Sequence, residues 1–420
     1  MFFFAPVTGC HRPVRENEVA PEDVLPRLSR STSPGHQLDL LNSLSALDPF
    51  GSQKALADAS RAVRPLLRSS DPEVAAKAGE LLSRWNDRSA LPALLGLLKR
   101  DDPLIRFSAA ASLGVLADPA AITGLVLGGG DPDSTVRAES CSALGTIGRR
   151  LKDASMPGSP AGSRRDDLKR IAAALRLRIH DPDGSVRASA ARSLGVVAAE
   201  GDIFPLLSLL RDPEPGVVGA AAAALGVLED RRAVPGLVAL LETSDPSVRK
   251  VAATALGDLG DSTGLPSLLL LSKDPDPEIR RSVLNALRLL GEPSTLPTVL
   301  DMAKDPDPQV AGQVPYVLAG LYDSSARDTL LPRLDDPDPK IRRCVALALG
   351  FVGEQRAIPR LMRALDDPDP LILVDAVTAL GWLGASEATE RMQRMAREDP
   401  RPEVREAAYL SLLQVYNLSR

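Results

Sequence analysis

The sequence predicts an all-α fold, an α-solenoid (α-α superhelix) of about eleven two-helix repeats. The first observation is a 31-residue period, and the second is a leucine that follows each periodic residue by eight positions. The third is an Asp-Pro pair that recurs just before the periodic residue. A period of this length is typical of stacked helical repeats, in which each repeat buries its apolar face against its neighbours.

The periodic residue is a Val or an Ile in every repeat. Eight of the ten intervals between successive ones are 31 residues long, one is 50 and one is 32. The series is Val74, Ile105, Val136, Val186, Val217, Val248, Ile279, Val310, Ile341, Ile372 and Val404. We therefore expect one continuous solenoid over residues 36–420 instead of several globular domains.

A helix is expected to begin at each Asp-Pro pair. The position three residues before the periodic Val or Ile is Asp in nine repeats, and the next position is Pro in nine. Asp245-Pro246 is an example, in which the Asp carboxylate caps free backbone N–H groups and proline occupies the first helical position. We call the helix that begins here the Asp-Pro helix. A second apolar segment, such as 233–241, completes an antiparallel pair of helices of about 10–14 residues each.

A glycine follows the periodic leucine in seven repeats, for example Gly257. It fits either close packing or helix termination.

The two ends of the chain differ from the repeats. Residues 1–35 contain five prolines and no helical period, so we expect an extended leader and linker there. Residues 37–47 are predicted to form an unpaired first helix that caps the stack, and about 402–417 the last helix. The 50-residue interval holds an insertion of 19 residues within about 150–168, whose Pro, Gly and Ser content predicts a flexible loop. Such a loop is either a binding element or a tolerated surface insertion.

The three cysteines fall into two groups. Cys141 and Cys344 lie in helical segments rich in small residues and are predicted to be buried free thiols. Cys10 closes the segment Val-Thr-Gly-Cys after Phe-Phe-Phe-Ala-Pro, and this segment resembles a bacterial lipobox. The resemblance implies a lipoprotein facing the periplasm or the cell surface, with the lipid on Cys10 as its only membrane anchor. A cytoplasmic protein is the alternative, because no basic residue precedes Cys10 and the apolar run is short.

The repeat at 229–257 resembles HEAT repeats, and most closely the short bacterial type found in phycobilisome lyases. The resemblance covers about residues 36–420. It implies an Asp and an Arg six residues apart that pair across repeats as a ladder. The matching positions are Asp131/Arg137, Asp181/Arg187, Asp274/Arg280, Asp336/Arg342 and Asp399/Arg405.

The ladder positions are not all filled. Arg106 and Arg249 lack the Asp, having Arg100 and Thr243 in its place, and Asp212, Asp305 and Asp367 lack the Arg. We therefore expect an interrupted ladder. The arginines are expected to pair structurally, with binding of an anionic partner as the alternative.

No pattern of catalytic residues stands out. The histidines, His11, His36 and His180, form no metal pair, and nothing matches a nucleophile elbow, a phosphate loop or a zinc-binding Cys pair. The predicted function is a non-enzymatic, monomeric scaffold without cofactor or metal that binds a protein along its concave surface. The resemblance leaves phycobilisome lyase-type chromophore attachment as an alternative.

Nucleic-acid binding is expected less, because the net charge is −5. Basic pairs do recur at equivalent positions of three Asp-Pro helices, and they could form a stripe that attracts an acidic protein segment. Solvated side chains and the ladder are the other explanation. The pairs are Arg249-Lys250, Arg280-Arg281 and Arg342-Arg343.

Overall fold

The structure is a computed structural model that describes residues 21–46, 52–153, 161–197 and 203–418. These residues form 24 α-helices and short 3-10 helices with no strand, which confirms the predicted all-α class. They divide into two compact units, Met1–Ala199 and Glu200–Arg420. None of the described helices is both long and apolar enough to cross a membrane.

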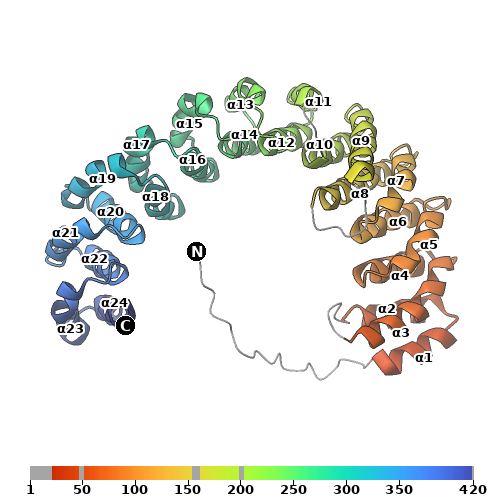
Figure 1. Cartoon of the computed structure of the whole chain (residues 1–420), viewed down its shortest axis with the longest axis horizontal. Helices are drawn as coiled ribbons and strands as arrows, with labels where there is room; N and C mark the ends of the chain where they lie inside the picture. The colour runs from red at the N-terminus through yellow and green to blue at the C-terminus, as the bar shows by residue number, and fades with distance from the viewer. Residues whose placement is uncertain (1–20, 47–51, 154–160, 198–202, 419–420) are drawn as a thin grey trace. The chain divides into compact units, whose positions relative to one another are not determined.

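In the N-terminal unit the Asp-Pro helices are α4, α6, α8 and α10, and they pack side by side (Figure 1). The bounds in this unit are α1 (Pro21–Arg30), α2 (Pro34–Leu44), α3 (Gln53–Val63), α4 (Pro72–Arg84), α5 (Leu91–Leu97), α6 (Pro103–Leu116), α7 (Ile122–Gly128), α8 (Ser134–Lys152), α9 (Ala161–Arg178) and α10 (Gly184–Val197).

In the C-terminal unit the even-numbered helices are the Asp-Pro helices. They line the inner side of this unit's arc, and the odd-numbered helices form its outer row (Figure 1). The bounds are α11 (Ile203–Leu209), α12 (Pro215–Val227), α13 (Val234–Leu240), α14 (Pro246–Leu259), α15 (Leu265–Leu270), α16 (Pro277–Leu290), α17 (Leu296–Asp301), α18 (Pro308–Gly320), α19 (Ser324–Leu330), α20 (Pro339–Phe351), α21 (Ile358–Ala364), α22 (Pro370–Trp382), α23 (Thr389–Glu398) and α24 (Pro402–Leu418).

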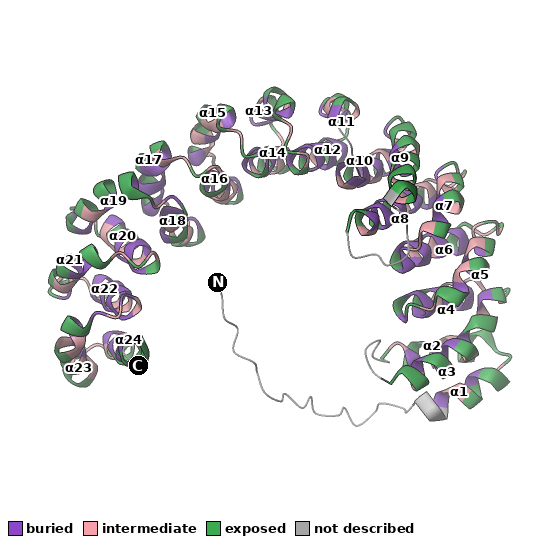
Figure 2. Ribbon diagram, in the orientation of Figure 1, coloured by how far each residue is buried: buried purple, intermediate pink, exposed green. Residues whose placement is uncertain are grey.

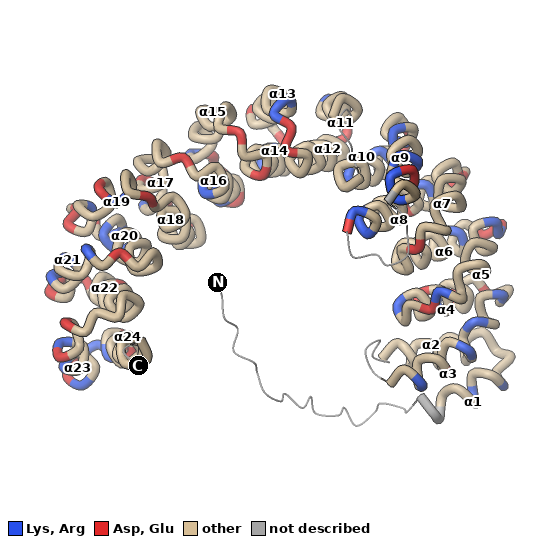
Figure 3. The backbone as a smooth tube through the Cα atoms, viewed as in Figure 1, with Lys and Arg blue, Asp and Glu red and all other residues tan. Residues whose placement is uncertain are grey.

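Asp-Pro pairs begin most of these helices as predicted; α8 and α10 have Ser and Gly in the Pro position, and α12 and α24 have Glu and Arg in the Asp position. The carboxylate of Asp245 accepts a hydrogen bond from Ser247 N at 2.8 Å, and that of Asp338 accepts one from Lys340 N at 2.9 Å. Proline follows the capping residue in both, where no backbone donor is needed. Figure 3 shows acidic residues recurring at the turns that lead into the Asp-Pro helices of the C-terminal unit.

The outer helix is shorter than predicted in most repeats. In a typical case a 3-10 helix, Arg231–Ala233, leads into the seven-residue helix α13. The side chain of Asp230 caps the tight turn by accepting a hydrogen bond from Arg232 N at 3.0 Å. The predicted length of 10–14 residues therefore covers two helical segments of different pitch.

The core lies between the two rows of helices and between neighbouring Asp-Pro helices (Figure 2). The periodic residues Leu256 and Leu287 are both fully buried. Gly257 lies inside α14, and a Cβ there would meet Ala286 Cα of α16 at 2.6 Å. This glycine therefore serves close packing between helices, and termination is ruled out as its role.

The predicted extended leader is partly wrong, because residues 21–30 form α1. Val24 and Leu28 lie four residues apart on one face of this helix and are buried. α1 packs against α2 and α3, and α2 also packs against α4. The helix predicted to cap the stack without a partner corresponds to α2, and it is paired with α1. Residues 1–20, including Cys10 and His11, lie outside the described part of the chain.

The predicted flexible loop at 150–168 is wrong for most of its length. α8 continues to Lys152, and α9 already begins at Ala161; only residues 154–160 lie outside the described ranges. The buried pair Ile147 and Leu151, one helical turn apart, extends the packed face of α8. The insertion therefore lengthens the Asp-Pro helix of one repeat and the outer helix of the next, to 19 and 18 residues.

Candidate protein-binding surface

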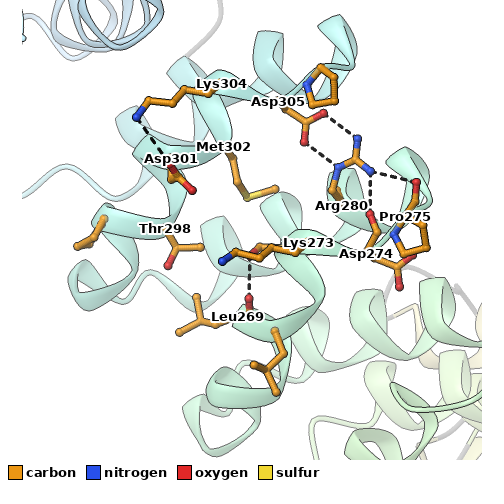
Figure 4. Close-up of a pocket in the computed structure, with 14 residues that line it drawn as sticks. Leu269, Lys273, Asp274, Pro275, Arg280, Thr298, Asp301, Met302, Lys304 and Asp305 are labelled. Carbon is orange, nitrogen blue, oxygen red and sulfur yellow. Dashed lines mark hydrogen bonds and ion pairs between the residues drawn. The ribbon is translucent and has the colours of Figure 1, made fainter. Parts of the chain in front are cut away.

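An arginine on one Asp-Pro helix ties its repeat to the next (Figure 4). Arg280 Nε and Nη2 donate to the two carboxylate oxygens of Asp305, both at 2.7 Å. Arg280 Nη1 donates to the backbone oxygens of Asp274 at 2.7 Å and Pro275 at 3.2 Å. Asp305 also accepts from Asp307 N at 2.9 Å, and Asp307 caps α18. One guanidinium thus joins the turns before two successive helices.

We call such an Arg–Asp pair a rung, and rungs recur in both units of the chain. In each, the arginine side chain reaches a carboxylate of the next repeat at 2.7–2.9 Å. The pairs are Arg106–Asp131, Arg137–Asp181, Arg249–Asp274, Arg280–Asp305 and Arg342–Asp367.

The six-residue spacing has a different origin from the one predicted. The residue six positions earlier supplies its backbone oxygen, as Asp131 does to Arg137 at 3.0 Å and Asp399 does to Arg405 at 2.9 Å. Asp181 does the same for Arg187 at 2.9 Å. Any residue can supply this oxygen, so the ladder is not interrupted at Arg106 or Arg249.

The rung is absent where its arginine is replaced, and the aspartate then finds another partner. Ala311 stands in the arginine position before Asp336, and Asp336 pairs within its own repeat with Arg333 at 2.9 Å. Asp399 likewise pairs with Arg401 at 2.8 Å. These contacts avoid an unpaired charge in a mostly buried place.

Pairing changes the acidity of the rung carboxyls. Burial alone would raise the pKa of Asp305, but the hydrogen bonds from Arg280 and from Asp307 N outweigh it and lower the pKa. The pKa of Arg280 is raised, first by its hydrogen bond to Asp305. Both groups therefore stay charged near neutral pH, as an inter-repeat clamp requires.

The first residue of each predicted basic pair is held in the ladder. The side chains of Arg249, Arg280 and Arg342 are 13%, 10% and 20% exposed and already bind carboxylates. These three guanidinium groups therefore link neighbouring repeats.

The second residues of the pairs also face acidic groups. Lys250 and Arg281 both bind Glu278, at 3.0 and 2.8 Å, and Arg343 binds Asp375 at 2.6 Å. All six cations of the predicted stripe therefore have carboxylate partners, which leaves little free positive charge for a nucleic acid or an acidic segment.

Three aromatic rings contact one another along successive Asp-Pro helices of the C-terminal unit, and the sequence did not predict this cluster. The centroids of Tyr316 and Phe351 lie 4.9 Å apart, and those of Phe351 and Trp382 lie 4.6 Å apart. They come from α18, α20 and α22. Tyr316 is 57% and Phe351 46% exposed. We call these three residues the aromatic row; the 31-residue spacing of Phe351 and Trp382 was a signal for two of them.

Other exposed large apolar side chains also gather on the Asp-Pro helices. α24 contributes Tyr409, Leu410, Leu413 and Tyr416. The outer helices of the C-terminal unit expose fewer, Phe204 and Leu270, among the described residues. The inner row of this unit therefore has the more apolar surface.

The two described cysteines are buried free thiols, as predicted. Burial raises the pKa of Cys141 and of Cys344 to about 12, so neither thiol is a nucleophile at neutral pH. Within the described ranges, no cluster of His, Cys, Asp and Glu is arranged to hold a metal ion.

A groove of about 740 Å³ lies between neighbouring outer helices of the C-terminal unit (Figure 4). Its charges are mixed: three cationic residues, Lys273, Arg280 and Lys304, line it together with Asp274, Asp301 and Asp305. Lys304 Nζ lies 3.7 Å from Asp301 Oδ1. This balance of charge gives the groove no preference for an anion or a cation.

The stacked two-helix repeats and their rungs define an α-solenoid repeat protein. The family model for HEAT repeats matches residues 60–145, 171–253, 203–271, 234–319, 266–337, 296–372 and 327–413. The chain therefore belongs to the HEAT-repeat family. No curated protein has a matching sequence.

Solved structures of nuclear transport proteins share the fold. Kap95 in a complex with Nup1 has a TM-score of 0.62 at 13% identity, with 94% of this chain and 62% of that chain covered. Importin beta has a TM-score of 0.57 at 14% identity, covering 94% and 63%. Kap95p bound to RanGDP has a TM-score of 0.56 at 13% identity, covering 96% and 61%. The chain thus spans less than two thirds of these proteins, and identities this low show the fold alone.

Proposed function

We propose that the protein is a non-catalytic scaffold that binds a protein partner along the inner face formed by its Asp-Pro helices. The aromatic row carries this proposal. Tyr316 and Phe351 expose about half of their surface while their tilted rings pack against each other, and aromatic side chains of this kind dominate the binding energy of protein interfaces. Kap95, a fold relative, has been solved in complex with a protein, Nup1.

The rungs complete the physical picture of the scaffold. They join the turns that lead into successive Asp-Pro helices, so the exposed aromatic and aliphatic side chains of those helices are held on a fixed frame. An extended partner would contact successive helices through many small patches.

The proposal is tested with a photoreactive amino acid placed at Phe351 in the native host. Leu270 on α15, 78% exposed, is the matched control on the outer row. We expect a reproducible protein adduct from position 351 that is weak or missing from position 270. The adduct should also diminish when Tyr316 is changed to Ser. Equal adducts from both positions, or none from 351, would contradict the proposal.

We also propose that Cys10 carries a lipid that tethers the scaffold to a membrane. Support comes from the Val-Thr-Gly-Cys segment and the proline-containing stretch after it. Intact-mass measurement of the native protein should show an acylated Cys10 in the membrane fraction, and Cys10→Ser should move the protein to the soluble fraction. Unmodified protein that retains residues 1–9 would refute the tether.

The phycobilisome lyase-type alternative has a simple discriminator. A chromophore-attachment factor should bind a tetrapyrrole, which absorbs visible light. A protein purified from its native host without visible absorbance, and unable to bind added bilin, would remove this alternative.

A further inference from the structure

A second groove lies in the N-terminal unit, between outer helical segments of neighbouring repeats. It is about 700 Å³ and is bordered by the 3-10 helix Arg64–Arg68, the 3-10 helix Arg88–Ala90 and α5. Its charged lining residues are Arg64, Arg68 and Arg100, and no Asp or Glu lines it. It therefore differs from the groove of Figure 4, whose lining contains both signs of charge.

The charge arises because one rung of the ladder is missing and its aspartate position holds an arginine. Arg100 occupies the position that holds Asp131, Asp274 or Asp305 in other repeats, six residues before the ladder arginine. Ala75 occupies the arginine position 25 residues earlier. The following ladder arginine, Arg106, donates at 2.9 Å to the backbone oxygen of Arg100 and not to its side chain. The guanidinium of Arg100 therefore takes no part in the ladder.

The groove has more cationic groups than its surroundings neutralise. Arg64 is held by Asp87, with Nε to Oδ2 at 2.5 Å and Nη2 to Oδ1 at 3.1 Å. Within the described ranges, the side chains of Arg68 and Arg100 have no carboxylate partner. Two guanidinium groups therefore face a solvent-filled groove without a counter-charge.

We propose that this groove binds an acidic peptide segment, whose carboxylates pair with Arg68 and Arg100. Guanidinium groups pair with carboxylates through two parallel hydrogen bonds, and this chain already uses that pairing in its rungs. The ligand supplies the carboxylate that is missing at this point of the ladder.

The groove is also partly apolar, with Leu67, Pro92 and Leu97 in its lining. That surface suits the carbon atoms of a peptide better than a hydrated inorganic ion. The site uses outer helical segments of the N-terminal unit, so it is separate from the aromatic row and does not depend on the function proposed for it.

The test uses fluorescence anisotropy of a fluorescein-labelled hexaglutamate peptide with the full chain at low ionic strength. We expect saturable binding that Arg68→Gln/Arg100→Gln weakens at least about tenfold, the loss of one or more charged hydrogen bonds. The matched control is Lys273→Gln/Lys304→Gln, which removes the same charge from the C-terminal groove and should leave binding unchanged. Equal weakening in the two double variants would overturn the proposal, because it would show attraction by general charge.

Gly96 offers a second pair of variants that are expected to fold. This residue lines the groove, and a Cβ at this position would meet nothing within 4 Å. Gly96→Glu places a carboxylate in the groove and should abolish peptide binding, whereas Gly96→Gln has the same size without the charge and should retain it. Either variant should favour helix α5, because glycine is a poor helix former. Equal binding by the two variants would contradict the proposal.

Inorganic phosphate serves as the competitor that separates a peptide site from a simple anion site. Millimolar phosphate should displace little hexaglutamate if the apolar lining contributes. Displacement by phosphate at the concentration at which unlabelled hexaglutamate displaces the probe would overturn the assignment of a peptide.

Discussion

Two interfaces in the C-terminal unit join neighbouring repeats by different means. Between α16 and α18, the rung Arg280–Asp305 adds two side-chain hydrogen bonds from one guanidinium to the apolar contact. Between α12 and α14, Val218 and Thr243 occupy the rung positions, so that interface has no such charge pair. Both interfaces nevertheless bury their periodic leucines fully. Apolar packing thus suffices to stack two repeats, and the rung adds a directional contact that fixes how they are aligned.

The largest expected effect is loss of the shared apolar contact. Leu225→Ala and Leu287→Ala each remove a fully buried side chain, one from each interface. We expect each to lower the free energy of unfolding by about 3 kcal/mol. Urea denaturation followed by circular dichroism measures both. A much smaller loss for Leu287→Ala would show that the rung, and not packing, holds its interface.

Breaking a rung should have the next largest effect. Arg280→Gln leaves the mostly buried Asp305 without its cation and should cost about 2–3 kcal/mol. The double variant Arg280→Gln/Asp305→Asn removes both charges and should cost less than the sum of the single changes. Additive single losses in a urea double-mutant cycle would show that the pair does not interact.

The rung should also make stability depend on pH. The folded pKa of Asp305 lies below its ordinary value, so the unfolded chain takes up a proton at a higher pH than the folded chain. The rung therefore contributes fully above about pH 5 and loses its contribution as the pH falls through the folded pKa, below about pH 4. Urea midpoints across this range should fall more for the wild type than for Arg280→Gln/Asp305→Asn. Parallel pH profiles would contradict the assignment.

Removing a helix cap should have a smaller, local effect. Asp338→Ala removes the hydrogen bond to Lys340 N and should cost about 1 kcal/mol. Asp338→Asn keeps a capping oxygen and should cost less. Hydrogen exchange in the first turn of α20 separates the two variants, and equal exchange rates would show that the side chain does not cap.

The smallest expected effect is the creation of a new rung. Val218→Arg/Thr243→Asp places a charge pair at the interface that lacks one, and it should change the free energy of unfolding by less than about 1 kcal/mol. A gain comparable to the loss from Arg280→Gln would mean that the α12–α14 interface is already shaped for a rung.

The parts of the fold that repeat were predictable from the sequence, and the parts that do not repeat were not. Asp245 and Pro246 act as expected because capping is a local property, and the same pattern recurs in most repeats. α1 was missed because Pro26 lies within it, and the pattern of Val24 and Leu28 spans only one turn. Helical residues 161–168 were missed because Gly and Ser there suggested a loop.

The candidate site likewise contains features that the sequence predicted and features that it did not. The ladder residues were found, but each pair joins two repeats, over 25 residues or 44 across the insertion, and only the stacking of repeats brings them close. The aromatic row was missed because Tyr316 occupies a different repeat position from Phe351 and Trp382, so alignment alone does not bring the three together. Arg100 was noted as a departure from the ladder, but its groove forms only when the outer segments pack.

Hydrogen exchange of the scaffold with and without its cross-linked partner tests the central claim most directly. If the inner face binds the partner, exchange should slow in α18, α20 and α22, which carry the aromatic row, and remain unchanged in the outer helices α17, α19 and α21. Slower exchange confined to the outer helices would contradict the account.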